Sequence, residues 1–246
     1  MALQDHLPGG YINSVVRVGE TVRRTLGPDA PFVHALLRHF EARGFEGAPR
    51  FLGIDAQGRE VLSFIEGHVA YASEQPPGVW SDESLLDVVR LTRRFHDLTA
   101  GTRLAGGSEV VCHNDLSPRN TVYIDRGEGY RPVAFIDWDG AHPGRRVEDI
   151  ADIFWQFLGP GPKHPWLDIH IRRMRAMCDS YGLADRSEVV RLMEHRMRGC
   201  IAGIIAKAAA GSAPHARLVE LGAPEEISID AEWVAANREA LEEGIR

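Results

Sequence analysis

Residues 110–120 read VVCHNDLSPRN, and residues 133–140 read VAFIDWDG. Each segment begins with apolar, β-rich residues and then turns abruptly polar, which is typical of a strand that ends at a functional loop. A glycine-containing turn at residues 127–129 joins the second segment to the strand-like residues 121–124 as a hairpin. The sequence therefore predicts that adjacent strand ends present their polar side chains together.

Three of these polar residues have the side chains that phosphoryl transfer needs. That reaction requires oxygen atoms that hold magnesium on nucleotide phosphates and a carboxylate that positions the acceptor hydroxyl. Asp115, Asn120 and Asp137 supply these groups. Asn120 follows Asp115 by five residues, so one loop can aim Asp115 at the acceptor and return Asn120 to the metal, with Pro118 stiffening the path.

The two motifs together resemble the signature of the aminoglycoside phosphotransferase and choline kinase branch of the protein-kinase-like fold. The signature is His-x-Asp-x-x-x-x-Asn, at His113–Asn120, followed by Ile-Asp-Trp-Asp at residues 136–139. The resemblance implies Asp115 as the catalytic base and Asn120 and Asp137 as magnesium ligands. It also implies that the acidic residue Asp149 braces the catalytic loop.

The same resemblance implies an α+β, two-lobed architecture. We expect an N-terminal nucleotide-binding lobe at residues 1–67, a small antiparallel β-sheet with one helix, and a larger, mainly helical catalytic and substrate-binding lobe at residues 68–246. Residues 7–18 resemble the first strand, phosphate-covering turn and second strand of the family. Residues 62–67 resemble its hinge, so Phe64 and Glu66 are expected to bind the nucleotide.

The chain departs from the family pattern where the phosphates are contacted. The stretch that matches the third strand, residues 21–24, reads TVRR and has no lysine. Arg24 is the best substitute because it lies two residues after Val22 and so shares its strand face, and arginine pairs bidentately with phosphate. The family's helix glutamate is also missing, because His34 stands at that place and Glu41 lies about two turns further along.

Apolar spacing predicts most of the remaining elements. Pro31 opens an amphipathic helix that ends before Gly44, and Ser81 caps a second helix. Further helices are predicted at residues 147–158, 166–181, 189–210 and 231–241, and short strands at residues 50–54 and 60–65.

Composition excludes several classes of protein. The chain has 246 residues, 44% hydrophobic and 26% charged, with a net charge of −7. A negative chain without a basic patch is not expected to bind nucleic acid, and no apolar run reaches the roughly 20 residues of a membrane span. We expect a cytoplasmic protein that does not bind membranes, and the oligomeric state is open. Its three cysteines, Cys112, Cys178 and Cys200, are expected to be ordinary buried thiols.

The expected reaction moves the γ-phosphoryl group of ATP, or of GTP, to a hydroxyl of a small molecule, with Mg²⁺ as cofactor. The family resemblance makes an aminoglycoside the first candidate acceptor. Residues 220–243 contain eight acidic residues and one basic residue, which would suit ammonium groups, but residues 163–217 contain ten basic and five acidic residues. The acceptor is therefore open.

Two other readings are open at this point. The missing lysine motivates a kinase-like protein with little or no turnover that binds a nucleotide, a toxin or a partner. His113, Asp115 and His142 motivate a hydrolytic metal site, since His-x-Asp spacing also occurs in such sites. Asp139 is either a ligand of a second metal or a residue that orients the loop.

Overall fold

The structure of the chain, a computed structural model, describes residues 4–6, 15–71 and 74–246. Most of the segment predicted to form the first strand and the phosphate-covering turn, residues 7–14, lies outside the described residues. The chain divides into two compact units, Met1–Arg146 and Val147–Arg246. The expected division at residue 67 into two lobes is a different one and stays a prediction.

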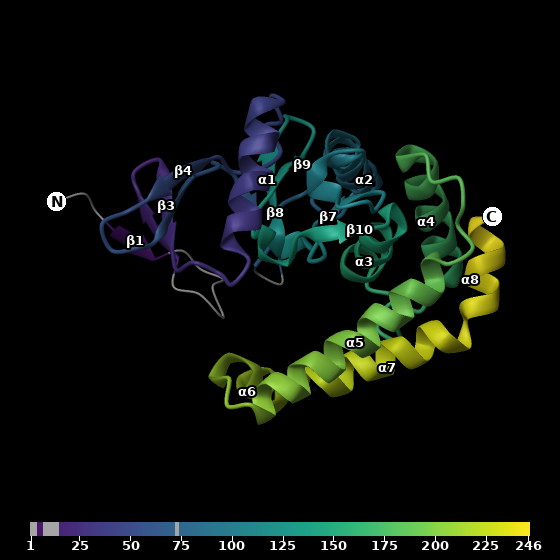
Figure 1. The fold of residues 1–246 in the computed structure, drawn as a ribbon. Coiled ribbons are helices and arrows are strands. Elements are labelled where there is room, and N and C mark those ends of the chain that lie inside the picture. Colours follow the sequence, from purple (N-terminus) through teal and green to yellow (C-terminus); the bar gives the residue numbers. More distant parts are fainter. Residues whose placement is uncertain (1–3, 7–14, 72–73) are drawn as a thin grey trace. The chain divides into compact units, whose positions relative to one another are not determined.

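Short β-rich segments in the first unit form a five-stranded antiparallel sheet, in purple and blue in Figure 1. Its strand order is β1-β2-β3-β5-β4, with β1 (Gln4–His6), β2 (Val16–Val18), β3 (Thr21–Arg24), β4 (Phe51–Ile54) and β5 (Glu60–Ser63). Gly19 takes a left-handed φ of 59° in the tight β2–β3 turn. The predicted strands at residues 50–54 and 60–65 are confirmed, and their register places Arg24 of β3 directly opposite Glu60 of β5.

Helix α1 (Ala30–Ala42) is the amphipathic helix predicted to open at Pro31. Its apolar face of Val33, Leu36, Leu37 and Phe40 is buried, and each such side chain contributes about 1.5–3 kcal/mol by leaving water. The helix packs against β4 and against the short helix η3 (Trp138–Gly140). It therefore connects the five-stranded sheet to the loop that carries Asp137.

The rest of the first unit carries the two polar loops. It contains β6 (His68–Val69), α2 (Asp82–Thr99), η1 (Arg103–Ala105), β7 (Val110–Cys112), η2 (Pro118–Asn120), β8 (Thr121–Asp125), β9 (Tyr130–Phe135) and β10 (His142–Gly144). Strands β6, β8 and β9 form one antiparallel sheet, and β7 pairs with β10. Ser81 caps α2 as predicted, since its hydroxyl accepts a hydrogen bond from Ser84 N at 3.1 Å.

Aromatic packing fixes the base of these loops. The Trp138 ring is buried, with its centroid 5.0 Å from Phe40 of α1 and 5.1 Å from Phe95 of α2. The indole Nε1 donates to Phe135 O at 3.0 Å, so its polar atom is satisfied inside the core. Trp138 therefore anchors the backbone of its neighbour Asp137.

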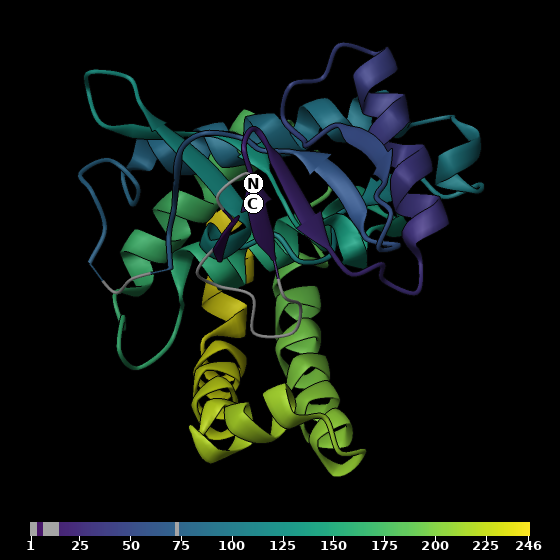
Figure 2. The same cartoon turned by 90° about the vertical axis from the view of Figure 1, so that its left-hand side faces the viewer.

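The second unit is helical. It contains α3 (Arg146–Leu158), α4 (Leu167–Tyr181), α5 (Val189–Ala209), α6 (Ala213–Glu220), α7 (Ala223–Ala236) and α8 (Arg238–Ile245). Helices α5 and α7 pack along each other and α6 joins them, in light green to yellow in Figure 1 and Figure 2. No helix among the described residues has both the length and the apolarity needed to cross a membrane.

Two predictions for this unit need correction. The single helix predicted at residues 231–241 is wrong: α7 ends and α8 begins at Asn237, whose side-chain amide donates to Trp233 O at 2.8 Å. Such a local bond from asparagine to the preceding turn competes with helix continuation. Cys112 and Cys178 are buried, as expected, but Cys200 is only half-buried.

Candidate functional site

Backbone hydrogen bonds tie the two polar loops together. The buried His113 ring shares a hydrogen bond between Nε2 and Ile136 O at 3.1 Å, and because a carbonyl only accepts, Nε2 is the donor. The Ile136 N–H donates to Asn120 O at 2.9 Å. One residue, Ile136, thus links both ends of the loop His113–Asn120 and immediately precedes Asp137. His113 props the loop and is remote from solvent.

Asp115 and Asn120 lie in contact at the open side of this loop. The Asn120 side-chain amide donates to Asp115 O at 2.9 Å and to Asp115 Oδ2 at 2.7 Å. A carboxylate has no proton to donate, so the amide nitrogen must face it. The amide oxygen of Asn120 is then the atom that can face a cation, while the exposed carboxylate of Asp115 faces solvent.

Asp137 adopts the left-handed backbone conformation, with φ 62° and ψ 62°, at the start of η3. Aspartate tolerates this conformation better than most residues. Among the described residues other than glycine, only Asn114, with φ 61°, shares it, and the Asn114 amide donates to Gly140 O at 3.1 Å. This hydrogen bond links the backbone turn at Asn114 to the turn that carries Asp137, whose side chain is 48% exposed.

Arg24 meets the Asp137 loop from β3. Its Nη1 donates to Asp137 Oδ1 at 2.8 Å, and its Nη2 and Nη1 donate to the two carboxylate oxygens of Asp139 at 2.6 and 3.2 Å. Its Nε forms an ion pair with Glu60 Oε1. Arg24 is buried, and its planar fork serves three carboxylates at once, which a lysine ammonium does not do with the same geometry. Asp139, whose role the sequence left open, accepts hydrogen bonds from Arg24 with both carboxylate oxygens.

Burial and mutual charge interactions shift the pKa values of Arg24 and Asp139. Burial lowers the pKa of the Arg24 guanidinium, but the carboxylates of Asp139, Glu60 and Asp137 outweigh that effect and raise it. Burial also raises the pKa of the Asp139 carboxyl, and the negative charges of Asp137 and Glu60 add to this against the opposing pull of Arg24. Three carboxylates share one guanidinium, so two negative charges are left unbalanced. Such a surplus attracts a divalent cation.

Glu60 and His34 also belong to the group of residues around Arg24. The sequence analysis did not identify Glu60. Glu60 is buried, and its second oxygen lies 2.9 Å from His34 Nε2 on α1. The His34 ring stacks on Phe51 at a centroid distance of 3.7 Å. Glu41, the candidate on the helix, is exposed. The only sequence signal for Glu60 is its place opposite Arg24, and that becomes visible only once the β3–β5 register is known.

The expected hinge residues form a separate contact. The Arg17 guanidinium lies over the Phe64 ring at 3.7 Å and pairs with Glu66 at 3.3 Å. The Phe64 backbone N–H donates to Glu20 O at 2.9 Å. Arg17 thus joins Phe64 and Glu66 to each other, and the Phe64 N–H is already engaged.

The sequence did not indicate Tyr71, whose hydroxyl interacts electrostatically with residues of the site. Burial raises the pKa of its hydroxyl, the charge of Asp137 adds to this, and Arg119 opposes it. The charges of the metal-ligand candidate Asp137 and of the exposed Arg119 therefore both act on the Tyr71 hydroxyl. No motif contains Tyr71, so nothing in the local sequence singles it out.

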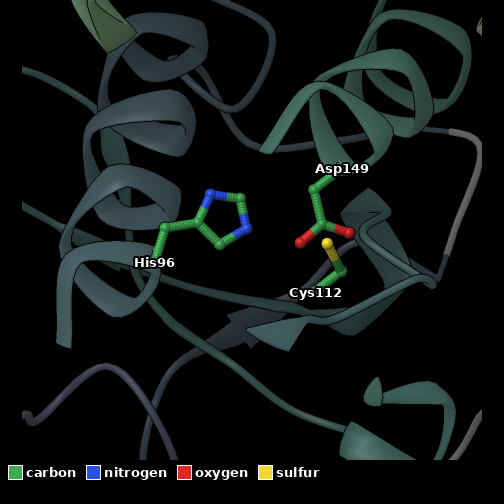
Figure 3. Close-up of side chains that lie close together, drawn as sticks. All are labelled: His96, Cys112 and Asp149. Carbon is green, nitrogen blue, oxygen red and sulfur yellow. The ribbon is translucent and has the colours of Figure 1, made fainter. Parts of the chain in front are cut away.

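Buried side chains lie around the C-terminal end of β7. Figure 3 shows His96 of α2 beside Cys112 at the end of β7, with a ring nitrogen and the sulfur within 4.8 Å. The Cys112 thiol donates to Arg145 O at 3.2 Å. Asp149, drawn in the same figure, lies in the first turn of α3 in the second unit. Its expected bracing of the loop stays a prediction.

The structure does not support the hydrolytic metal site that His113, Asp115 and His142 suggested. Within the described part of the chain, His113, Asp115 and His142 do not form a group at metal-binding distance. His113 is committed to Ile136, and the exposed His142 has its Nδ1 2.9 Å from its neighbour's carbonyl oxygen, Pro143 O.

Solved structures share this fold. A choline/ethanolamine kinase family protein from Mesorhizobium loti superposes with a TM-score of 0.57 and 18% identity, over 95% of this chain and 92% of that one. The aminoglycoside phosphotransferase APH(3'')-Id from Streptomyces rimosus, in complex with ADP and streptomycin, gives a TM-score of 0.57 and 17% identity, over 78% and 91%. The predicted α+β, two-lobed protein-kinase-like fold is confirmed.

Sequence comparisons identify the family to which this kinase-like chain belongs. The family model of the phosphotransferase enzyme family matches residues 80–177. The trifolitoxin immunity protein of Rhizobium leguminosarum bv. trifolii is 34% identical over 205 residues, which cover 72% of this chain and 74% of that protein. The chain belongs to the phosphotransferase enzyme family, as its resemblance to aminoglycoside phosphotransferases and choline kinases implied.

Proposed function

We propose that this protein transfers the γ-phosphoryl group of ATP or GTP to a hydroxyl of a small molecule. The observation that carries the proposal is one connected arrangement. Asn120 holds the Asp115 carboxylate, Ile136 ties Asn120 to the start of the Asp137 turn, and Asp137 meets Arg24. These are the base, the cation ligands and the phosphate contact that phosphoryl transfer requires.

Each residue has a distinct role in this proposal. Asp115 accepts or orients the proton of the acceptor hydroxyl, since its exposed carboxylate is fixed by Asn120. The Asn120 amide oxygen and the Asp137 carboxylate are the hard oxygen ligands that suit Mg²⁺, and the surplus negative charge around Arg24 favours a divalent ion. Bound magnesium would neutralise charge on the nucleotide phosphates. Arg24 turns its N–H groups to the phosphate oxygens.

The nucleotide base is assigned to the hinge segment of residues 62–67. Phe64 and Glu66 remain the proposed contacts there, with Phe64 offering its ring face rather than its engaged N–H. Arg17, which lies over that face, has to move when a base stacks on Phe64. Binding of ATP and of GTP, measured separately, distinguishes the two candidate donors.

The acceptor is proposed to be a small cationic molecule, with an aminoglycoside tried first. The relative in Streptomyces rimosus was solved with streptomycin, and the acidic residues 220–243 of this chain suit ammonium groups. We place the protein in the cytoplasm, where ATP is available, and assign it no nucleic-acid or membrane partner.

A second function is favoured by one specific observation. The relative with 34% identity is a toxin immunity protein, so the chain can be a kinase-like protein that protects by binding a nucleotide, a toxin or a partner with little or no turnover. Arg24 in place of the usual lysine, paired with the metal-ligand candidate Asp137, fits a slow site.

Two measurements separate these functions. Thermal-shift screening with ATP, GTP and ADP, each with and without Mg²⁺, identifies the donor, because a ligand that binds the native state raises the melting temperature. Phosphate transfer to a panel of aminoglycosides and small alcohols is then followed by mass spectrometry of the acceptor. Phosphorylated acceptor that disappears with Asp115→Asn supports the kinase, whereas nucleotide or toxin binding without product supports the binding protein.

A further inference from the structure

The three carboxylates that pair with Arg24 differ in their exposure to solvent. The side chain of Glu60 is 2% exposed, while those of Asp139 and Asp137 are 31% and 48% exposed. A buried ion strongly resists losing its partner, because the remaining charge would stay desolvated and uncompensated. A half-exposed carboxylate can exchange its partner for water or a cation at far smaller cost. Glu60 is therefore the permanent partner of Arg24, and the two aspartates are exchangeable ones.

Both oxygens of Glu60 are fixed. Oε1 pairs with Arg24 Nε, and Oε2 accepts from His34 Nε2 at 2.9 Å. The His34 ring is itself held between α1 and the stacked Phe51 of β4. Pairing through Nε leaves the two terminal nitrogens of Arg24 at the open side of the guanidinium, where they now bind Asp137 and Asp139.

Building on the proposed function, we propose that Glu60, supported by His34, is the residue that positions Arg24 for the nucleotide phosphates. A strand glutamate thereby performs the task that the resemblance assigned to a glutamate of helix α1, and α1 contributes the supporting histidine instead. Without nucleotide, Arg24 Nη1 and Nη2 donate hydrogen bonds to Asp137 and Asp139. When a metal-bound nucleotide arrives, the aspartates release these N–H groups to the phosphate oxygens while Glu60 keeps the Nε side in place.

The proposal predicts that Glu60 acts on the nucleotide only through Arg24. Dissociation constants for ADP with Mg²⁺ are measured for wild type, Arg24→Ala, Glu60→Gln and the double variant, each with its melting temperature. We expect Glu60→Gln and Arg24→Ala each to weaken ADP binding roughly tenfold, and the double variant to be no weaker than Arg24→Ala alone, because contacting residues in one network are not additive. Losses that multiply in the double variant would overturn the proposal.

His34 provides a second route if removing a buried charge prevents folding. His34→Gln retains an N–H donor for Glu60 and is expected to bind ADP within about threefold of wild type, whereas His34→Ala weakens binding several-fold. Equal affinities of the two variants would contradict the supporting role. Asp152→Asn is the matched control, because Asp152 is another buried carboxylate paired with an arginine, Arg196, in the second unit. It should lower the melting temperature and leave the ADP affinity unchanged.

The same measurements distinguish a failure of the proposed function from a failure of the positioning role of Glu60. A wild-type protein that binds no Mg²⁺-nucleotide overturns the proposed function and the positioning role together. A wild type that binds nucleotide, with Glu60→Gln binding equally well, overturns the positioning role alone.

Discussion

The side-chain amide of Asn120 donates to both the backbone oxygen and the carboxylate of Asp115, at 2.9 and 2.7 Å. This relationship orients two residues at once, since it fixes the carboxylate and turns the amide oxygen of Asn120 the other way. The base and one cation ligand of the proposed site are thus set by a single side chain within one loop.

Asp115→Asn should remove transfer and spare binding. Loss of a positioned carboxylate costs about 10²–10⁴-fold in turnover, while the nucleotide contacts assigned to Asn120, Asp137 and Arg24 remain. Turnover and nucleotide affinity are measured in parallel. Asp125→Asn is the control, an exposed aspartate that caps the turn at Gly127, and it should behave as wild type. An Asp115→Asn protein that phosphorylates its acceptor normally would show that Asp115 is not the base.

Arg24→Lys should reduce activity, although it restores the family's residue type. A lysine ammonium does not reproduce the fork that meets Glu60, Asp137 and Asp139, so we expect nucleotide affinity to fall about tenfold. Arg23→Lys is the matched control, because Arg23 bonds Thr21 and pairs with Asp55 instead. A large gain in transfer with Arg24→Lys would instead indicate a naturally impaired site and favour the binding protein.

Trp138→Phe should destabilise the protein and loosen the Asp137 turn. The smaller ring leaves space against Phe40 and Phe95 and loses the bond to Phe135 O, at a cost of about 2 kcal/mol. Urea unfolding measures this change, and the magnesium concentration for half-maximal nucleotide binding should rise with it. Trp166→Phe, at a position 55% exposed, should change the free energy of unfolding by less than about 0.5 kcal/mol.

The second unit should lose stability below neutral pH through His170. Burial lowers the pKa of this histidine, and its Nε2 donates to His164 O at 2.7 Å. The unfolded chain therefore binds the proton more readily than the folded one, so the free energy of unfolding falls as pH drops below the ordinary histidine pKa of about 6.5. His170→Gln keeps a donor without titrating. Melting temperatures from pH 8 to pH 5 should fall more steeply for wild type than for this variant, and parallel curves would contradict the assignment.

The features that the sequence predicted depend on residues that lie close together in the chain. The loops His113–Asn120 and Ile136–Asp139 follow from short spacings and from the strands that precede them. Helix α1 follows from its apolar face, which tertiary packing then preserved. These features depend on residues a few positions apart, where periodicity and capping are informative.

The features that sequence reasoning missed depend on register or on competing local bonds. Glu60 is 36 positions from Arg24 and becomes its partner only because β3 and β5 pair in one register. The break at Asn237 depends on a side-chain bond to Trp233 that apolar spacing does not reveal. Nothing in the sequence around Tyr71 indicates its electrostatic interaction with Asp137.

Calorimetric titration of ADP into wild type and Asp137→Asn, at millimolar Mg²⁺ and again with the metal chelated, tests the proposed metal and nucleotide site most directly. We predict that wild type binds ADP only with Mg²⁺ and that Asp137→Asn loses at least about tenfold in affinity, with Asp125→Asn unchanged. Equal binding by wild type and Asp137→Asn, or equal binding with and without metal, would contradict the site described above.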